Sequence, residues 1–187
     1  SGGAQLGAVK LPVMLVESME ALNLRPGSSL VDGTLGLAGH ARAFCQEIAP
    51  DGKFIGIDWD EAMLAEAKLR MAEVQGVDCH FFHADYRDIA RCVVEVTGKV
   101  GVDAIFLDLG LNNAQIADPK RGISFVGEGP LDMRMDRSRG ETASQGLNRW
   151  TEGEIERILP VFGDENGAKK IAQVVVETRK ESPLKTT

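Results

Sequence analysis

The chain has 187 residues, of which 43% are apolar and 26% are charged, and its net charge is −7. These values are ordinary for a folded globular protein and exclude a disordered or fibrous one. The negative net charge also argues against a protein that binds nucleic acid over its whole surface. No apolar run approaches the roughly 20 residues of a membrane-spanning helix, and no signal peptide is visible. We therefore expect a cytoplasmic protein without membrane contact, or an organellar one if a transit peptide has been removed.

The first part of the chain alternates between helical and strand patterns. Helices are predicted at residues 13–22, 38–48, 61–74 and 86–96, and strands at 29–32, 53–58, 79–83 and 102–107. This alternation is typical of an α/β fold with a parallel, doubly wound sheet. The last strand is almost entirely apolar, as strands covered on both faces are, yet here it would be an exposed edge. We therefore expect an incomplete sheet that is completed by further residues or by another chain.

The second part of the chain is less regular. Residues 112–150 show no periodic pattern and contain several prolines and glycines, which predicts a long functional loop. Thr151 and Glu154 form a capping box ahead of a helix, and a second helix is predicted at residues 169–180. Ser182-Pro183 predicts the start of another helix. The chain is thus expected to divide into domains at residues 1–117 and 118–187.

A glycine-rich turn follows the first predicted strand. Gly33, Gly36 and Gly39 are spaced by three residues, and Asp58 ends the next strand. Glycines let the backbone approach a ligand closely, and a carboxylate at this position can accept hydrogen bonds from both hydroxyls of a ribose. The spacing departs from the Gly-x-Gly-x-x-Gly that holds a pyrophosphate, so a phosphate-free cofactor such as S-adenosylmethionine fits better. The alternative role of Asp58 is to cap the following helix.

The carboxyl ends of the predicted strands indicate one ligand site. The residues at these ends are Gly33, Asp58, Asp85 and Asp108. Ligands of doubly wound sheets bind beyond the carboxyl ends of the strands, so we expect these residues to converge. Cys45, Cys79 and Cys92 lack Cys-x-x-Cys spacing and are expected to be reduced core thiols. The histidines lack a ligand-spaced partner, so no metal is expected.

Charge is spread unevenly along the chain. From residue 118 onward twelve basic residues balance twelve acidic ones, so residues 1–117 carry the whole net charge. Residues 120–150 are net positive, with four acids against Lys120, Arg121, Arg134, Arg137, Arg139 and Arg149. A polyanion would bind to this segment; the alternative is an ordinary solvated surface of mixed charge.

Several motifs together resemble one known family. They are Pro12-Val13-Met14-Leu15, Val31-Asp32-Gly33-Thr34, Gly39-His40, Asp108-Leu109-Gly110, Arg121-Gly122-x-Ser124-Phe125 and Gly129-Pro130-Leu131-Asp132-Met133-Arg134-Met135-Asp136. Over residues 10–187 the chain resembles the MraW (RsmH) family, S-adenosylmethionine-dependent cytosine-N4 methyltransferases of small-subunit ribosomal RNA. The last motif is long and unusual, and therefore highly specific. Family members continue further, which supplies the rest of an inserted helical domain and the remaining strands.

The resemblance implies a Rossmann-like class I methyltransferase domain at residues 1–117 and the start of an inserted substrate-binding domain at 118–187. The expected S-adenosylmethionine contacts are Gly33, Ala38, Gly39, His40, Asp58, Tyr86, Asp108 and Gln115. His40 has packing or capping at a helix start as its alternative, and Tyr86 could equally be a core aromatic. The implied partner is small-subunit ribosomal RNA or the small ribosomal subunit, and a homodimer is left open.

The chemistry indicates the catalytic candidates. The exocyclic amine of cytosine is a weak nucleophile, so an enzyme must align it with the sulfonium methyl and place acceptors on its protons. Asp108 and the amide oxygen of Asn112 are the candidate acceptors, and Arg121, Arg134 and Arg137 are the candidate RNA contacts. The target base must be unstacked, which favours a loop or junction in the RNA.

Three positions depart from the family pattern. Lys10 replaces a histidine, Ala38 replaces a glycine, and Asn112-Asn113-Ala114 replaces Ser-Ser-Pro. The last change lies beside the proposed chemistry, so it affects turnover more than cofactor binding. An RNA methyltransferase is the first hypothesis, and a ribosome-associated factor that binds the cofactor without turnover is the second. Methylation of a small molecule or a protein is weaker, because the motif at residues 129–136 indicates the RNA family.

Overall fold

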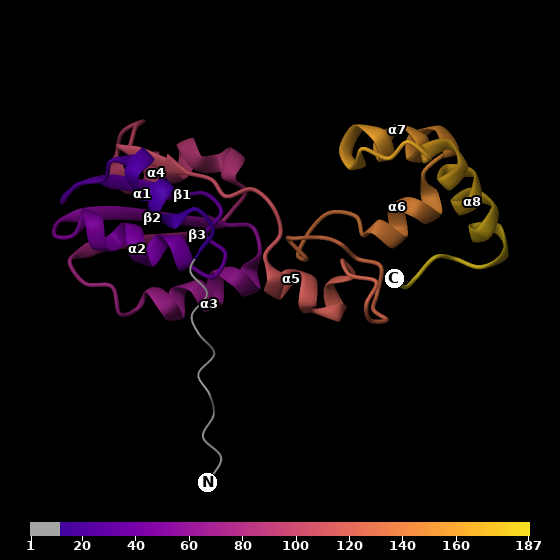
Figure 1. Cartoon of the computed structure of the whole chain (residues 1–187), viewed down its shortest axis with the longest axis horizontal. Coiled ribbons are helices and arrows are strands. Elements are labelled where there is room, and N and C mark those ends of the chain that lie inside the picture. Colours follow the sequence, from indigo (N-terminus) through magenta and orange to yellow (C-terminus); the bar gives the residue numbers. More distant parts are fainter. Residues whose placement is uncertain (1–11) are drawn as a thin grey trace, which may run out of the picture. The chain divides into compact units, whose positions relative to one another are not determined.

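The computed structural model describes residues 12–187, so Lys10 lies outside the described residues. Two compact units, Ser1–Gly110 and Leu111–Thr187, make up the chain (Figure 1). The assignment of cofactor binding to residues 1–117 and of substrate binding to residues 118–187 stays a prediction. No helix in the described part of the chain is long and apolar enough to cross a membrane.

The first unit is a parallel sheet with helices on both faces. In chain order its elements are α1 (Leu15–Leu22), β1 (Ser29–Asp32), α2 (Gly39–Ile48), β2 (Gly52–Asp58), α3 (Glu61–Met71), β3 (Val77–His83), the 3-10 turn η1 (Tyr86–Asp88), α4 (Ile89–Thr97) and β4 (Ala104–Phe106). The four strands are ordered β3-β2-β1-β4, and every pairing is parallel. The chain first builds outward from β1 to β3 and then crosses back to β4. The doubly wound sheet expected from the sequence is therefore confirmed.

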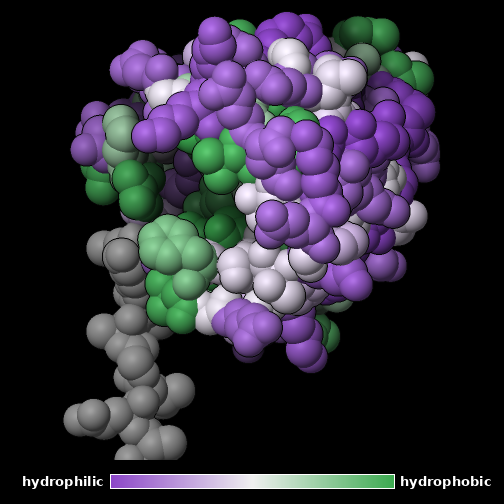
Figure 2. Space-filling model, turned by 90° about the vertical axis from the view of Figure 1, so that its right-hand side faces the viewer, coloured by the Kyte–Doolittle hydropathy of each residue, from purple (hydrophilic) through white to green (hydrophobic). Residues whose placement is uncertain are grey.

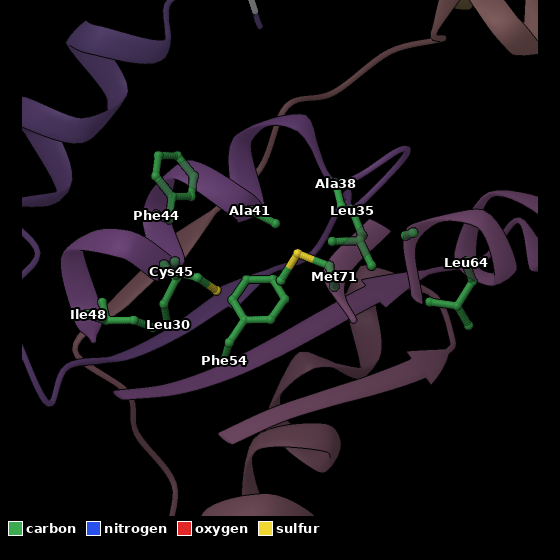
Figure 3. Packing of buried hydrophobic residues seen from close by; sticks show 11 residues of the cluster. Leu30, Leu35, Ala38, Ala41, Phe44, Cys45, Ile48, Phe54, Leu64 and Met71 are labelled. Carbon is green, nitrogen blue, oxygen red and sulfur yellow. The ribbon is translucent and has the colours of Figure 1, made fainter. Parts of the chain in front are cut away.

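Alternating strand side chains build two apolar layers. On one face Leu30 and Phe54 pack against α2 and α3, and Figure 3 shows this cluster around the Phe54 ring. On the other face Val31, Ile55 and Ile57 pack against α4. All five side chains are fully buried, and each contributes about 1.5–3 kcal/mol through removal from water. This core fixes the carboxyl ends of the strands on which the site is built.

The edge strand β4 carries apolar side chains that are only partly covered. Among residues 12–187, β4 pairs with β1 alone, and Ile105 on this strand is 49% exposed. Leu107 and Leu109, which follow the strand, are also exposed. The exposed apolar edge expected from the sequence is therefore present.

The second unit contains more helix than the sequence predicts. Its elements are α5 (Asn113–Ala117), the 3-10 turn η2 (Pro119–Arg121), α6 (Ala143–Arg149), α7 (Glu152–Gly163) and α8 (Ala168–Glu181). The capping box of Thr151 and Glu154 before α7 is confirmed. The uninterrupted loop expected at residues 112–150 is wrong, because α5 and α6 lie within it.

The last residues of the chain are also different from the prediction. The helix expected from Ser182-Pro183 does not form in this structure. The chain instead runs extended, and Thr186 forms an antiparallel bridge with Pro130. The backbone N–H of Leu131 donates to the carbonyl of Lys185 at 2.9 Å. Pro183 is compatible with both an extended segment and the first turn of a helix. The bridge to Pro130 stabilises the extended conformation.

Candidate active site

The strands of the first unit end together. The N–H of Gly33 donates to the carbonyl of Phe106 at 3.0 Å, which joins the ends of β1 and β4. The N–H of Leu35 donates to Ile57 at 3.1 Å, and that of Ala84 donates to Asp58 at 3.1 Å. Backbone hydrogen bonds therefore hold the loops that leave all four strands side by side.

The turn after β1 is tightly constrained. A Cβ atom on Gly33 would lie 2.5 Å from Cδ2 of Leu107 and 3.2 Å from Cβ of Tyr86, so a larger residue here would displace the Leu107 side chain. Gly36 and Ala38 both have left-handed backbone conformations, with φ of 52° and 61°. The left-handed conformation destabilises an alanine by about 1–2 kcal/mol, whereas the glycine that the family has at this position adopts it without strain. Ala38 directly precedes α2, whose N-terminus has no side-chain cap within the described residues.

Asp58 ties this turn to the end of β2. Its Oδ2 accepts a hydrogen bond from the N–H of Gly36 at 2.7 Å, and its Oδ1 accepts one from the N–H of Asp60 at 2.9 Å. The side chain that caps α3 is Asp60, which accepts from Ala62 and Met63. The alternative role of Asp58 as the cap is therefore wrong. Each Asp58 oxygen keeps a lone pair that a ribose hydroxyl could use.

The pKa of Asp58 rises above its usual value, because burial disfavours the charged form. The hydrogen bonds from Asp60 and Gly36 act in the opposite direction and stabilise the carboxylate. Asp58 is thus a buried acceptor held in one orientation.

Asp32 is a buried carboxyl that the site prediction did not include. It ends β1, is 1% exposed, and its Oδ1 accepts from the N–H of Thr34 at 3.0 Å. Burial, together with the smaller effect of the negative charges of Asp58 and Asp108, raises its pKa to about 7, although the hydrogen bond from Thr34 acts in the opposite direction. The signal in the sequence was an acid at the end of an otherwise apolar strand.

The three carboxyls make the strand ends a site for a cation. Asp58 and Asp108 lie close enough to Asp32 to disfavour its ionisation. A positive ligand group would relieve that repulsion, whereas a pyrophosphate would add to it. S-adenosylmethionine carries a sulfonium and an ammonium group and no phosphate. The residues present therefore fit this cofactor better than a dinucleotide.

His40 has structural partners. Its Nε2 lies 2.9 Å from the carbonyl oxygen of Val13, and its ring centroid lies 4.8 Å from that of Phe106. The ring also stacks on Phe44. These contacts connect α2 to the start of α1 and to β4. They support the packing alternative for His40, and its cofactor contact stays a prediction.

Tyr86 lies on the surface beyond β3. It is 42% exposed, so it is not a core aromatic, and its Cβ lies near the turn at Gly33. Asp85 precedes it and accepts hydrogen bonds from the backbone and guanidinium of Arg87 at 2.9 and 2.7 Å. This ion pair fixes the backbone at Tyr86 and leaves the ring available for an adenine.

The remaining candidates belong to different units. Asp108 lies in the first, where its N–H donates to Oγ1 of Thr34 at 2.7 Å. Asn112 and Gln115 lie in the second and form a capping box for α5. Oδ1 of Asn112 accepts from the N–H of Gln115 at 2.9 Å, and Oε1 of Gln115 accepts from the N–H of Asn112 at 3.1 Å. Their roles toward cofactor and substrate stay predictions.

The candidate RNA-binding arginines differ in exposure. The Arg121 side chain is 5% exposed, with its Nε 3.7 Å from Asp118. Arg134 forms two hydrogen bonds with Asp132 and thereby holds the pKa of that carboxyl below its usual value. Arg137 also faces Asp132 but is half-exposed. Of the three, Arg137 has the most exposed side chain, and the RNA contacts of all three stay predictions.

The sequence matches the model of one protein family, the MraW methylase family, over residues 8–187. The chain belongs to the MraW methylase family. It is 42% identical over 177 residues to the ribosomal RNA small subunit methyltransferase H of Citrifermentans bemidjiense and 43% identical to that of Trichlorobacter lovleyi. Each alignment covers 95% of this chain and 56% of the relative, so the chain spans about half the length of these relatives.

Solved structures resemble this chain more weakly. The crystal structure of TrmN from Thermus thermophilus aligns with a TM-score of 0.44 and 21% identity, covering 59% of this chain and 32% of that one. The family membership rests on the sequence match. Together with the parallel, doubly wound sheet, it gives the Rossmann-like methyltransferase fold expected from the resemblance.

Proposed function

We propose that this chain is part of an enzyme that transfers a methyl group from S-adenosylmethionine to N4 of a cytidine in small-subunit ribosomal RNA. The main support is the cluster of Asp32, Asp58 and Asp108 at the strand ends, in a member of the MraW methylase family. The partner would be the ribosomal RNA or the small subunit in the cytoplasm.

The residues of the first unit would bind and orient the cofactor. Asp58 would accept hydrogen bonds from the ribose hydroxyls, and Tyr86 would pack on the adenine. Asp32 and Asp108 would stabilise the positive charges at the methionine end. The bound cofactor supplies a methyl group made electrophilic by its sulfonium.

Proton acceptors and RNA contacts complete the proposal. Loss of a proton from the cytosine amine makes the nitrogen a better nucleophile, so an acceptor beside it contributes to the rate. Asp108 would take up this proton, and the amide oxygen of Asn112 would accept a hydrogen bond from the amine and help to orient it. Arg137 would bind the RNA backbone, with Arg121 and Arg134 ordering the segment around it.

The test is transfer of tritiated methyl from labelled S-adenosylmethionine to small ribosomal subunits that lack the modification, using the longest natural form of the protein. We expect incorporation into the RNA, and nuclease digestion should give N4-methylcytidine. Label in another nucleoside or in ribosomal protein would contradict the proposed substrate. Absence of label with intact cofactor binding would favour a ribosome-associated factor without turnover.

Substitutions at Asn112 distinguish an active methyltransferase from a ribosome-associated factor without turnover. Serine caps helices about as well as asparagine does, so Asn112→Ser should leave the free energy of unfolding within about 0.5 kcal/mol of the original. If the family's serine contributes to catalysis, the same change should raise the methylation rate, whereas Asn112→Ala should lose the cap and gain no rate. Single-turnover methylation and urea unfolding measure the two effects. An unchanged rate in Asn112→Ser would show that this departure does not limit turnover.

A further inference from the structure

The second unit presents a pair of apolar side chains almost completely to solvent. Phe125 and Val126 are 91% and 88% exposed, at the tip of the loop formed by residues 122–130. Most of the surface visible in Figure 2 is hydrophilic, with small hydrophobic patches. A phenylalanine left in water forgoes the favourable free energy that burial of its ring would give. This exposure leaves the face of the ring accessible to a ligand.

The base of this loop is closed by backbone packing. Gly122 has φ of +64°, and a Cβ atom there would collide with the carbonyl of Pro130. A Cβ atom on Gly129 would collide in the same way with the carbonyl of Pro119. The two sides of the loop therefore approach more closely than side chains would allow. This close backbone packing restricts the movement of the loop.

The tip itself is also held in place. Oγ of Ser124 accepts a hydrogen bond from the N–H of Val126 at 3.1 Å. Thr187 donates from its hydroxyl to the carbonyl of Gly127 at 3.0 Å and from its N–H to Gly129 at 3.1 Å. A loop fixed in this way loses little conformational entropy when a ligand binds its tip.

Positive charge lies at the base of the same loop. The N–H of Asp132 is close to Gly122, which places Asp132 there. Its carboxylate is 8% exposed and is covered by Arg134 at 2.7 Å and by Arg137 at 3.8 Å. The Asp132 carboxylate is thus buried, whereas the Arg137 side chain is 48% exposed. The guanidinium of Arg137 therefore faces solvent at the base of the loop. Glu128 is the opposing charge within the loop.

We propose that Phe125 is a stacking platform for an unpaired RNA base, while arginines at the loop base bind the adjoining backbone. An exposed aromatic ring beside cationic side chains is the combination that binds single-stranded RNA. The inference rests on the proposed RNA substrate and adds the residue that engages it. Loss of one stacked base weakens binding about 5- to 150-fold.

Fluorescence anisotropy of a labelled, mixed-sequence single-stranded RNA of about 12 nucleotides, at low salt, tests the proposal. We expect Phe125→Ala to raise the dissociation constant about tenfold or more. Phe125→Trp should retain binding, since stacking needs an aromatic face, and Phe125→Leu should not. Phe162→Ala is the matched control, because Phe162 is 86% exposed on α7 of the same unit. Its affinity should stay within about twofold of the original.

Several outcomes would overturn the proposal. They are unchanged RNA binding in Phe125→Ala, equal losses in Phe125→Ala and Phe162→Ala, and full retention in Phe125→Leu. A large drop in the melting temperature of Phe125→Ala would show instead that the ring is packed in solution. Conversion of a dimer to a monomer without a change in RNA affinity would assign the tip to self-association.

The binding assay does not depend on methylation, so the two proposals can fail separately. RNA binding that depends on Phe125, in a protein that methylates no ribosomal RNA, would leave the stacking role intact. Methylation of small subunits with the same KM in Phe125→Ala would leave the enzyme assignment intact and remove the stacking role.

Discussion

Replacement of Asp58 with alanine is expected to weaken S-adenosylmethionine binding by one or more decades. A hydrogen bond to a charged group contributes about 1.5–3 kcal/mol, and the change removes the acceptor for the ribose hydroxyls. It also removes the acceptor of the N–H groups of Gly36 and Asp60, so the turn after β1 loses its tie to β2. Isothermal titration calorimetry measures the affinity. An unchanged affinity would show that Asp58 has no role in cofactor binding.

A ligand lacking one ribose hydroxyl separates the direct contact from the effect on the turn. The 2′-deoxy form of S-adenosylhomocysteine should bind the original protein more weakly than S-adenosylhomocysteine does. In Asp58→Ala the two ligands should bind alike, because the partner of the hydroxyl is gone. If the hydroxyl still mattered equally in the variant, Asp58 would act on the turn alone.

The first unit could be predicted from the sequence because its signals are strong and local. The strand Ser29–Asp32 was predicted with the observed bounds, since an apolar run followed by a glycine turn leaves little choice. The role of Asp58 could not be decided in the same way. Asp58 and Asp60 flank one residue at a helix start, and either acid has the chemistry of a cap. The backbone path selects Asp60 and leaves Asp58 for the turn.

Two helices of the second unit were missed because they are short. Helical periodicity needs a window of about 11–18 residues, while α5 has five residues and α6 has seven. Their capping boxes, Asn112 with Gln115 and Thr142 with Gln145, were the signals available. The net charge of residues 120–150 was also insufficient to identify the exposed arginines. It indicated a cationic segment, but it did not show that Arg121 is buried within that segment.

The free energy of unfolding is expected to fall as the pH rises from about 4 to about 7. Burial raises the pKa of Asp32 from 3.8 to about 7 in the native state. In this window the folded protein holds a proton that the unfolded chain has lost, so stability present at low pH is lost on the way to neutral pH. At 1.36 kcal/mol per pKa unit the ceiling is roughly 4 kcal/mol.

Asp32→Asn should flatten this profile and unfold at higher urea concentration than the original protein at about pH 8. The amide oxygen can still accept from the N–H of Thr34, so the turn is kept. Asp58, whose pKa burial also raises, still contributes a change of the same sign in the variant. If the variant is less stable than the original protein at this pH, the Asp32 carboxylate raises the free energy of unfolding instead of lowering it.

Cofactor binding should follow the opposite trend with pH. A sulfonium favours the ionised form of Asp32, so S-adenosylmethionine should bind more tightly as the pH rises through about 7 and should release a proton. S-adenosylhomocysteine lacks that charge and should show a weaker dependence, and Asp32→Asn should remove the difference between the two ligands. Equal pH profiles for both ligands in the original protein would contradict a role for Asp32 in binding the cation. If the two profiles differ as expected, the buried carboxyl that lowers stability at neutral pH is also the group that binds the cation of the methyl donor.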